Sequence, residues 1–219
     1  MIKQLKFAVI LSGCGVFDGS EIHEATLTLL YIKKNNIDYE IFAPDIVQDS
    51  VINHITGKES NEKRNVLVES ARIARGKILP LSQFDSNKFD AIIFPGGFGV
   101  AKNLSTYAKE NYNCKVNNEV AKAIFEMNKS GKPIGALCIA PVILAKILGN
   151  IKITTGQDIN TANNIKKMGA IHENTSNCEI VIDLKNKIVT SPCYMLDSSI
   201  VQIAEGIENA IKAVIKLIK

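Results

Sequence analysis

The sequence predicts an α/β fold in which a mostly parallel sheet is covered by helices on both faces. Three apolar runs, residues 7–11, 91–94 and 133–137, lack alternating polar positions, as expected of strands buried on both sides. Each run ends at a glycine-rich or turn-forming segment, and helical patterns lie between the runs. Strands that alternate with helices form parallel sheets, and such sheets bind ligands beyond the carboxyl ends of their strands.

The first elements are a strand at 7–11, a helix and a second strand. Ser20 is the expected N-cap of the helix, because apolar residues recur at helical spacing from residue 22 to 32. Asn35 and Asn36 end this helix, and the second strand covers residues 39–42, before a proline. The order strand, helix, strand begins the doubly wound pattern.

Residues 46–80 interrupt this regular pattern. The segment 51–57 is typical of a loop or short hairpin, 65–74 is helical, and 78–80 returns as a short strand. Because irregular segments of this length are usually functional or mobile, we interpret 46–80 as a lid or oligomer-facing insertion.

The remaining elements resume the pattern. Beyond the runs at 91–94 and 133–137, we expect a strand at 151–155 and helices at 116–129, 140–148 and 161–168. Two short strands at 180–183 and 188–190 flank a hairpin-like turn, and an apolar stripe predicts a final helix over 200–218. The 219 residues therefore form one domain.

Composition excludes several functional classes. The net charge is only +4 and the basic residues are scattered, which argues against nucleic-acid binding. No apolar stretch approaches membrane-spanning length, and the run at 7–11 is too short for a signal peptide.

The five cysteines are widely spaced and form no C-x-x-C pair. This argues against a disulfide framework and against structural zinc, so we expect no metal. A reducing cytoplasm is the expected location.

Cys138 is the candidate nucleophile. It ends the apolar run 133–137 and a helical pattern begins behind it, which is the pattern of a nucleophile elbow. A helix N-terminus favours the thiolate, so we expect this thiol to be ionised. Cys14 also follows a strand and is a candidate neighbour, whereas Cys114, Cys178 and Cys193 are interpreted as packing or surface residues.

Glycine-rich turns follow other predicted strands, at the same edge of the sheet as Cys138. Gly96 and Gly97 allow backbone N–H groups to turn inward, which suits an oxyanion hole, and the N–H of Ile139 is a second donor.

A proton partner for the thiol is expected from the first helix. Glu21 and Glu24 lie near its start, and a carboxyl held against a thiol in a dry pocket would keep its proton. Glu21 fits an ordinary first-turn acid better than Glu24 does. His23 alternates with the two acids and should face elsewhere, while His54 in the insertion is a possible cover for the site. His172 is interpreted as a loop or strand-edge residue.

Several motifs resemble the ElbB family, described as isoprenoid-biosynthesis glyoxalases in the PfpI-like branch of the class I glutamine-amidotransferase-like superfamily. The likeness runs nearly end to end, and its strongest segments are residues 11–24, 42–45, 51–54, 95–105, 138–141 and 188–195. The resemblance implies a flavodoxin-like three-layer sandwich, a cofactor-independent glyoxalase activity on a small aldehyde, and a homodimer.

By motif, the resemblance assigns Cys138 as nucleophile, Glu24 as its acidic partner, and Gly97 and Ile139 as oxyanion donors. One departure concerns histidine: Thr155 and Gly156 stand where many superfamily members carry one, and Ile139 replaces the histidine that follows the cysteine in the proteases. This disfavours a Cys-His-acid triad. Two alternatives stay open, a redox-sensing or small-molecule-binding regulatory protein and an amidase partnered with a synthase.

Overall fold

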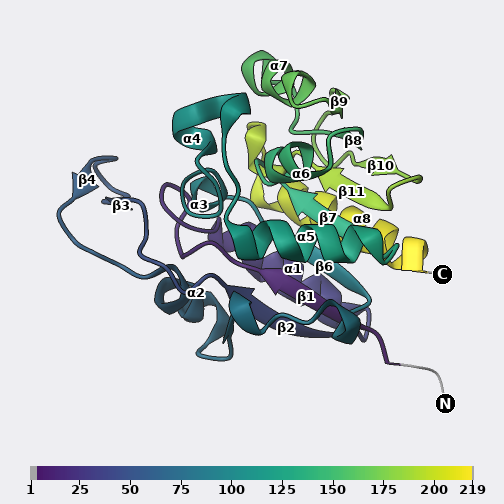
Figure 1. The fold of residues 1–219 in the computed structure, drawn as a ribbon, viewed down its shortest axis with the longest axis horizontal. Coiled ribbons are helices and arrows are strands. Elements are labelled where there is room, and N and C mark those ends of the chain that lie inside the picture. The colour runs from purple at the N-terminus through teal and green to yellow at the C-terminus, as the bar shows by residue number, and fades with distance from the viewer. Residues whose placement is uncertain (1–3, 219) are drawn as a thin grey trace.

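The computed structural model describes residues 4–218 and is built around one seven-stranded sheet (Figure 1). The strand order is β10 (Val181–Asp183), β11 (Ile188–Ser191), β7 (Ile134–Leu137), β6 (Ala91–Phe94), β1 (Lys6–Ile10), β2 (Asp38–Ala43) and β5 (Leu79–Pro80). Neighbouring strands are parallel except for the β10–β11 hairpin. The predicted α/β fold with a mostly parallel sheet is confirmed, and it is of the flavodoxin-like type.

Helices cover both faces of the sheet. One face carries α1 (Ile22–Lys34) and α8 (Ile200–Ile218), and α2 (Val66–Ala74) lies beside β2. The other face carries α3 (Phe98–Lys102), α4 (Tyr107–Glu110), α5 (Asn118–Lys129), α6 (Pro141–Leu148) and α7 (Ile159–Lys167). In Figure 1, α5 and α6 lie in front of the sheet and α8 behind it. Four 3-10 turns also lie within residues 4–218, at Leu81–Gln83, Ser86–Lys88, Asn111–Asn113 and Cys193–Met195.

The apolar strands divide their side chains between two cores. In β1, Ala8 and Ile10 pack into the core under α5 and α6, whereas Phe7 and Val9 pack into the core under α1 and α8. Successive side chains of a strand point to opposite faces, so covering both faces requires a continuous apolar run. This explains why the strands show no alternation in the sequence.

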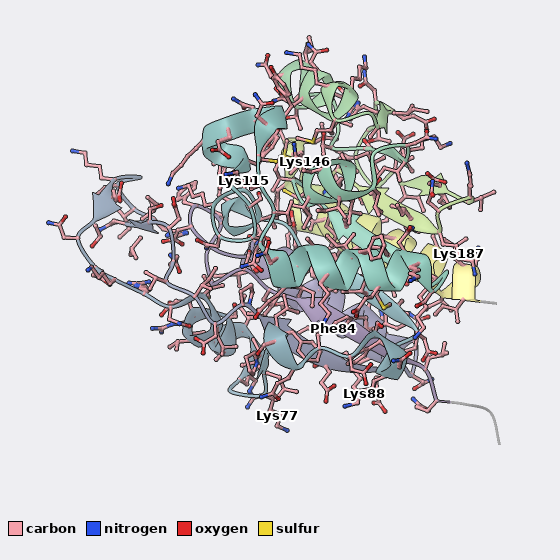
Figure 2. The ribbon with its side chains drawn as sticks, in the orientation of Figure 1. Lys77, Phe84, Lys88, Lys115, Lys146 and Lys187 are labelled. Carbon is pink, nitrogen blue, oxygen red and sulfur yellow. The ribbon has the colours of Figure 1, made fainter. Side chains whose placement is uncertain are left out.

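An aromatic cluster closes the core near β2. The ring of Phe84, labelled in Figure 2, stacks on Phe89 with centroids 5.5 Å apart and meets Phe42 edge-on at 5.6 Å. Offset-stacked and edge-to-face pairs of this kind stabilise a core beyond the area they bury. The cluster fixes the segment between β5 and β6 against the sheet.

Two expectations about single elements need correction. The strand expected at 151–155 is only β8 (Lys152–Ile153), and it pairs with β9 (Ile171–His172) in a separate small sheet. The strand that pairs with β7 on this side of the sheet is β11. The N-cap of α1 is Glu21 and not Ser20, because the Glu21 carboxylate accepts the Glu24 N–H at 2.7 Å.

The irregular part of 46–80 is also narrower than expected. Strand β5 pairs with β2 and α2 connects them, so these residues form an ordinary strand–helix–strand unit of the sheet. Only the hairpin of β3 (Val51–Ile52) and β4 (Glu59–Ser60) stands apart, and Figure 1 shows it projecting from one side of the molecule.

Candidate functional site

Cys138 lies in a strained turn between β7 and α6. Its φ is +59°, a conformation that costs a residue with a side chain about 1 to 3 kcal/mol and tends to occur at functional sites. The Cys138 N–H donates to the Ser191 carbonyl at 2.9 Å, which continues the β7–β11 pairing by one residue. The predicted turn at the end of β7 is therefore present, and α6 begins at Pro141, three positions later.

The carboxyl of Glu24 meets the Cys138 thiol by a hydrogen bond. Glu24 is fully buried in the first turn of α1. Its Oε2 accepts the Gly96 N–H at 2.9 Å, and its Oε1 accepts the Tyr194 N–H at 3.3 Å. Backbone groups from two different loops thus hold this carboxyl in place against the sulfur.

Gly96 permits the close approach of the thiol and the acid. A Cβ at this position would lie 2.7 Å from Glu24 Oε2, 3.0 Å from Cys138 Sγ and 2.4 Å from Cys138 Cβ. Contacts this short are sterically forbidden, so a side chain here would push the two groups apart. The glycine is needed for the site as well as for the turn.

The Glu24 carboxyl keeps its proton at neutral pH. Burial raises its pKa to about 8, and the negative charge of the neighbouring Glu21 acts in the same direction. The hydrogen bonds from the Tyr194 and Gly96 N–H groups and from the Cys138 thiol oppose this rise without cancelling it.

The expectation of an ionised thiol is wrong for the resting protein. Burial raises the pKa of Cys138 well above its usual range, and the charges of Glu24 and Cys193 raise it further. The helix N-terminus is outweighed because the sulfur is enclosed, with only 6 % of the residue exposed. The Cys138 thiol and the Glu24 carboxyl therefore titrate as a coupled pair, and the sulfur can attack only after the pair has lost a proton.

Two backbone N–H groups point at the Cys138 sulfur. The N–H groups of Gly97 and Ile139 hydrogen-bond to it and lower its pKa. Gly97 has φ +98°, and a Cβ there would lie 2.4 Å from the Glu21 nitrogen and the Gly19 carbonyl oxygen. Gly96, expected to assist in the oxyanion hole, instead donates its N–H to Glu24, since the acid occupies that position.

The structure places three other candidates away from the thiol. Glu21 caps α1 and acts on Glu24 through its charge. Cys14 is half-buried and near Glu69, whose charge adds to burial in raising the pKa of Cys14, and it does not line the cavity beside Cys138. His54 accepts the Phe17 N–H at 3.2 Å through Nε2, so it packs on the glycine-rich turn and does not cover the sulfur.

The remaining histidines also lie apart from the thiol. His23 is exposed, as expected from its spacing, and its Nδ1 lies 2.9 Å from the Tyr194 hydroxyl. His172 is in β9, where its Nε2 lies 3.1 Å from the Thr155 hydroxyl. All three histidines fall within residues 4–218, and their hydrogen bonds go to groups other than Cys138, although Tyr194, the partner of His23, lines the same cavity as Cys138.

Sequence reasoning missed two residues that follow β11. Tyr194 supplies the second N–H to Glu24, and Cys193, interpreted as a packing or surface residue, is buried beside the pair. Burial and the charge of Glu24 raise the pKa of the Cys193 thiol well above its usual range. The position of both after a strand next to β7 was the available signal, since parallel strands bring such turns to one edge.

A cavity of about 340 Å³ opens beside Cys138. It is lined by Val16, Gly97, Phe98, Ala101, Tyr107, Ala108, Asn111, Cys138, Ile139, Asn160, Thr161, Asn164, Tyr194 and Met195. A larger hollow of about 790 Å³ lies between α1, β2 and the α2–β5 connection, and none of its lining residues belongs to the site. The smaller cavity is the candidate substrate pocket because it reaches the sulfur.

Residues 4–218 contain neither a cluster of potential metal ligands nor a helix suited to span a bilayer. No three histidine, cysteine, aspartate or glutamate side chains there gather as metal ligands would. No helix in the same range has the length and apolar character needed to cross a bilayer.

Comparisons with known proteins place the chain among its relatives. It is 46 % identical over 222 residues to the human glutamine amidotransferase-like class 1 domain-containing protein 3, mitochondrial, covering 97 % of this chain and 83 % of the relative. It is 35 % identical over 229 residues to the zebrafish ES1 protein, mitochondrial, covering 96 % and 85 % respectively. These relatives are named as mitochondrial proteins, which contradicts the cytoplasmic location expected from the cysteine pattern.

Solved structures agree with the fold. A crystal structure described as an isoprenoid biosynthesis protein with amidotransferase-like domain from Ehrlichia chaffeensis matches with a TM-score of 0.91 at 38 % identity, over 97 % of this chain and 99 % of that one. Glyoxalase III from Candida albicans matches with a TM-score of 0.60 at 16 % identity, over 95 % and 97 %, which supports the fold alone. The DJ-1/PfpI family model matches residues 15–195, and the chain therefore belongs to the DJ-1/PfpI family, within the class 1 glutamine amidotransferase-like superfamily.

Proposed function

We propose that the protein is a glutathione-independent glyoxalase that converts 2-oxoaldehydes into 2-hydroxy acids without a cofactor. The observation that carries this proposal is the buried hydrogen bond between the Cys138 thiol and the Glu24 carboxyl. The motif resemblance to ElbB glyoxalases supports it.

The reaction begins with addition of sulfur to the aldehyde. The Cys138 sulfur bonds to the aldehyde carbon, the thiol proton leaves through the coupled pair, and the carbonyl oxygen becomes the hydroxyl of a hemithioacetal. We assign the N–H groups of Gly97 and Ile139, which hydrogen-bond to the sulfur, to stabilising the developing oxyanion.

Glu24 then moves one proton between the two carbons of the substrate. It removes the proton from the carbon bonded to sulfur and returns a proton to the neighbouring carbon, by way of an enediol. The product is a thioester of a 2-hydroxy acid, and no electrons enter or leave the pair of substrate carbons. Water hydrolyses the thioester, which releases the acid and regenerates the thiol.

A carboxyl with a pKa of about 8 suits this role. A proton carrier works best when its pKa is close to the working pH, because it can then both accept and donate. Burial and the Glu21 charge bring Glu24 into that range, whereas an exposed glutamate would be too weak a base.

The amidase alternative has less support. Attack on an amide needs a general acid for the amine that leaves, and histidine usually supplies it. None of His23, His54 and His172 hydrogen-bonds to Cys138. An aldehyde is a stronger electrophile with no leaving group, so the cysteine–carboxyl pair suffices for it.

The test is glycolate formation from glyoxal by the purified protein, without glutathione or added metal. Cys138→Ala and Glu24→Gln should each lower kcat/KM by at least about 100-fold, whereas the matched control Cys178→Ala should stay within about twofold of the wild type. Retained activity in Cys138→Ala would exclude the assigned nucleophile.

The regulatory alternative is decided by peroxide treatment in the same experiment. Sulfinic acid at Cys138, identified by mass spectrometry, together with no turnover of glyoxal, would favour a redox sensor. The raised thiol pKa argues against rapid oxidation, because oxidants react with the thiolate.

A further inference from the structure

Much of the lining of the cavity beside Cys138 is apolar. Five apolar residues belong to its lining together with Cys138, namely Val16, Phe98, Ala101, Ile139 and Met195. Ala101 is buried on α3, whereas half of Phe98 is exposed at the surface. An aldehyde bound to the Cys138 sulfur would therefore place its remaining carbon atoms against hydrocarbon.

Uncharged polar groups line the part of the cavity formed by α4 and α7. The Asn164 amide donates to the Tyr107 hydroxyl at 3.2 Å, and Asn111, Asn160 and Thr161 also belong to the lining. Figure 1 shows α4 and α7 on the side of α3 and α6 that faces away from the sheet. Amides and hydroxyls can hydrogen-bond to a neutral polar substituent on a substrate.

No lysine, arginine, aspartate, glutamate or histidine belongs to the lining of this cavity among residues 4–218. The nearby Lys102 ammonium donates instead to the Phe17 carbonyl at 3.1 Å and to the Ser50 hydroxyl at 3.2 Å. A substrate with a phosphate or carboxylate would lose its hydration on entry and gain no opposite charge, which is costly.

The volume sets the size of the substrate. At about 30 Å³ for a water-sized group, 340 Å³ holds about eleven non-hydrogen atoms, nearly three times as many as glyoxal has. We propose that this cavity selects uncharged 2-oxoaldehydes that carry an apolar group of about the size of a phenyl ring. The selection rests on the proposed glyoxalase function, since it defines the substrate of the same site.

The first experiment compares turnover of glyoxal, phenylglyoxal and 4-carboxyphenylglyoxal, with each rate normalised to addition of the same aldehyde to free glutathione. Phenylglyoxal should exceed glyoxal in normalised kcat/KM by at least about tenfold, because each buried methylene-sized group adds discrimination. The carboxylated analogue should fall at least about tenfold below phenylglyoxal. A preference for glyoxal or for the anion would overturn the proposal.

The second experiment does not depend on turnover. Cys138 is alkylated at pH 9.5 with iodoacetamide, N-benzyl-iodoacetamide or iodoacetate, and the rates are read by mass spectrometry relative to free cysteine. The benzyl reagent should react at least about tenfold faster than iodoacetamide, and iodoacetate should be slowest. If no aldehyde is turned over but this order is found, the glyoxalase function fails and the selectivity of the cavity stands.

A variant of the lining ties both results to this cavity. Ala108 is an exposed residue of α4 that lines it, so Ala108→Phe should fill the space and remove the advantage of the phenyl and benzyl compounds. The neighbouring Lys109 does not line the cavity, and Lys109→Ala should leave the order unchanged. An unchanged order in Ala108→Phe, equal normalised rates for the three reagents, or a Cys138 that reacts with none of them would each overturn the inference.

Discussion

Replacing Glu24 with glutamine should make the unfolding free energy of the protein fall less as the pH rises. Glu24 is fully buried, and its carboxyl keeps a proton that an unfolded chain would release near pH 4.5. A carboxyl whose pKa is raised in the folded state stabilises the fold most below its unfolded pKa, and this contribution is lost as pH rises toward the folded pKa. Glutamine does not titrate, so the variant lacks this loss.

The pKa of Glu24 sets the expected size of the effect. The range from pH 5.5 to 7.5 lies between the ordinary 4.5 and the folded value of about 8. Each pH unit in that range costs up to about 1.4 kcal/mol. The wild type should therefore lose about 2 to 3 kcal/mol of unfolding free energy through this one group across the two pH values.

The assay is urea unfolding of both proteins at pH 5.5 and pH 7.5. The glutamine amide can accept only one of the two N–H groups, from Gly96 and Tyr194, that the carboxyl now accepts. The lost hydrogen bond makes the variant less stable by an amount that does not depend on pH. This amount cancels when the unfolding free energy at pH 7.5 is subtracted from that at pH 5.5. With a slope of about 2 kcal/mol per molar urea, the remaining difference moves the midpoint by about 1 M.

The comparison also removes the titration of all other groups, because they are present in both proteins. If the pH dependence of the two proteins agreed within about half a kcal/mol, Glu24 would not carry a raised pKa. If the glutamine variant lost more unfolding free energy than the wild type between pH 5.5 and pH 7.5, the sign of the effect would be reversed and the assigned pKa of Glu24 would also be refuted.

Three further predictions follow from the same geometry. Gly96→Ala should lower kcat/KM at least about 100-fold and destabilise the fold by about 1 to 3 kcal/mol, because its Cβ would lie 2.4 Å from that of Cys138; normal activity would contradict the packing. Since the Glu24–Cys138 pair must lose a proton before sulfur attacks, kcat/KM should rise about tenfold per pH unit and level off above about pH 8; a flat profile from pH 6 to 9 would count against the pair. His54→Ala should cost about 1 kcal/mol in thermal or urea unfolding through its lost bond to the Phe17 N–H, with activity within about twofold; a large loss of activity would return His54 to the chemistry.

The fold followed from the sequence because both faces of the sheet are buried. Uninterrupted apolar runs at β1, β6 and β7 are the direct consequence of two cores, and the turns behind them meet at one edge. Strand β8 was misplaced because two paired residues carry too little pattern to show which sheet they join.

The site could be predicted only in part. The turn at Cys138 has a local signature, but the choice between Glu21 and Glu24 rested on resemblance, since both acids lie at the start of one helix. Tyr194 was missed because it holds Glu24 through a backbone N–H, which every residue but proline carries. The ionisation of the thiol was wrong because a local argument about the helix terminus ignored burial by segments distant in sequence.

Helix α8 has a consequence for how the chain is made. Its buried residues, such as Ile203, Ile207 and Ile211, cover the same face of the sheet as α1, and it follows all the strands in the sequence. During synthesis, the apolar face of the sheet that α8 covers is therefore shielded only in part, by α1, until this last helix emerges. That interval is when the nascent protein is most exposed to aggregation, and a chaperone that shields hydrocarbon would act there.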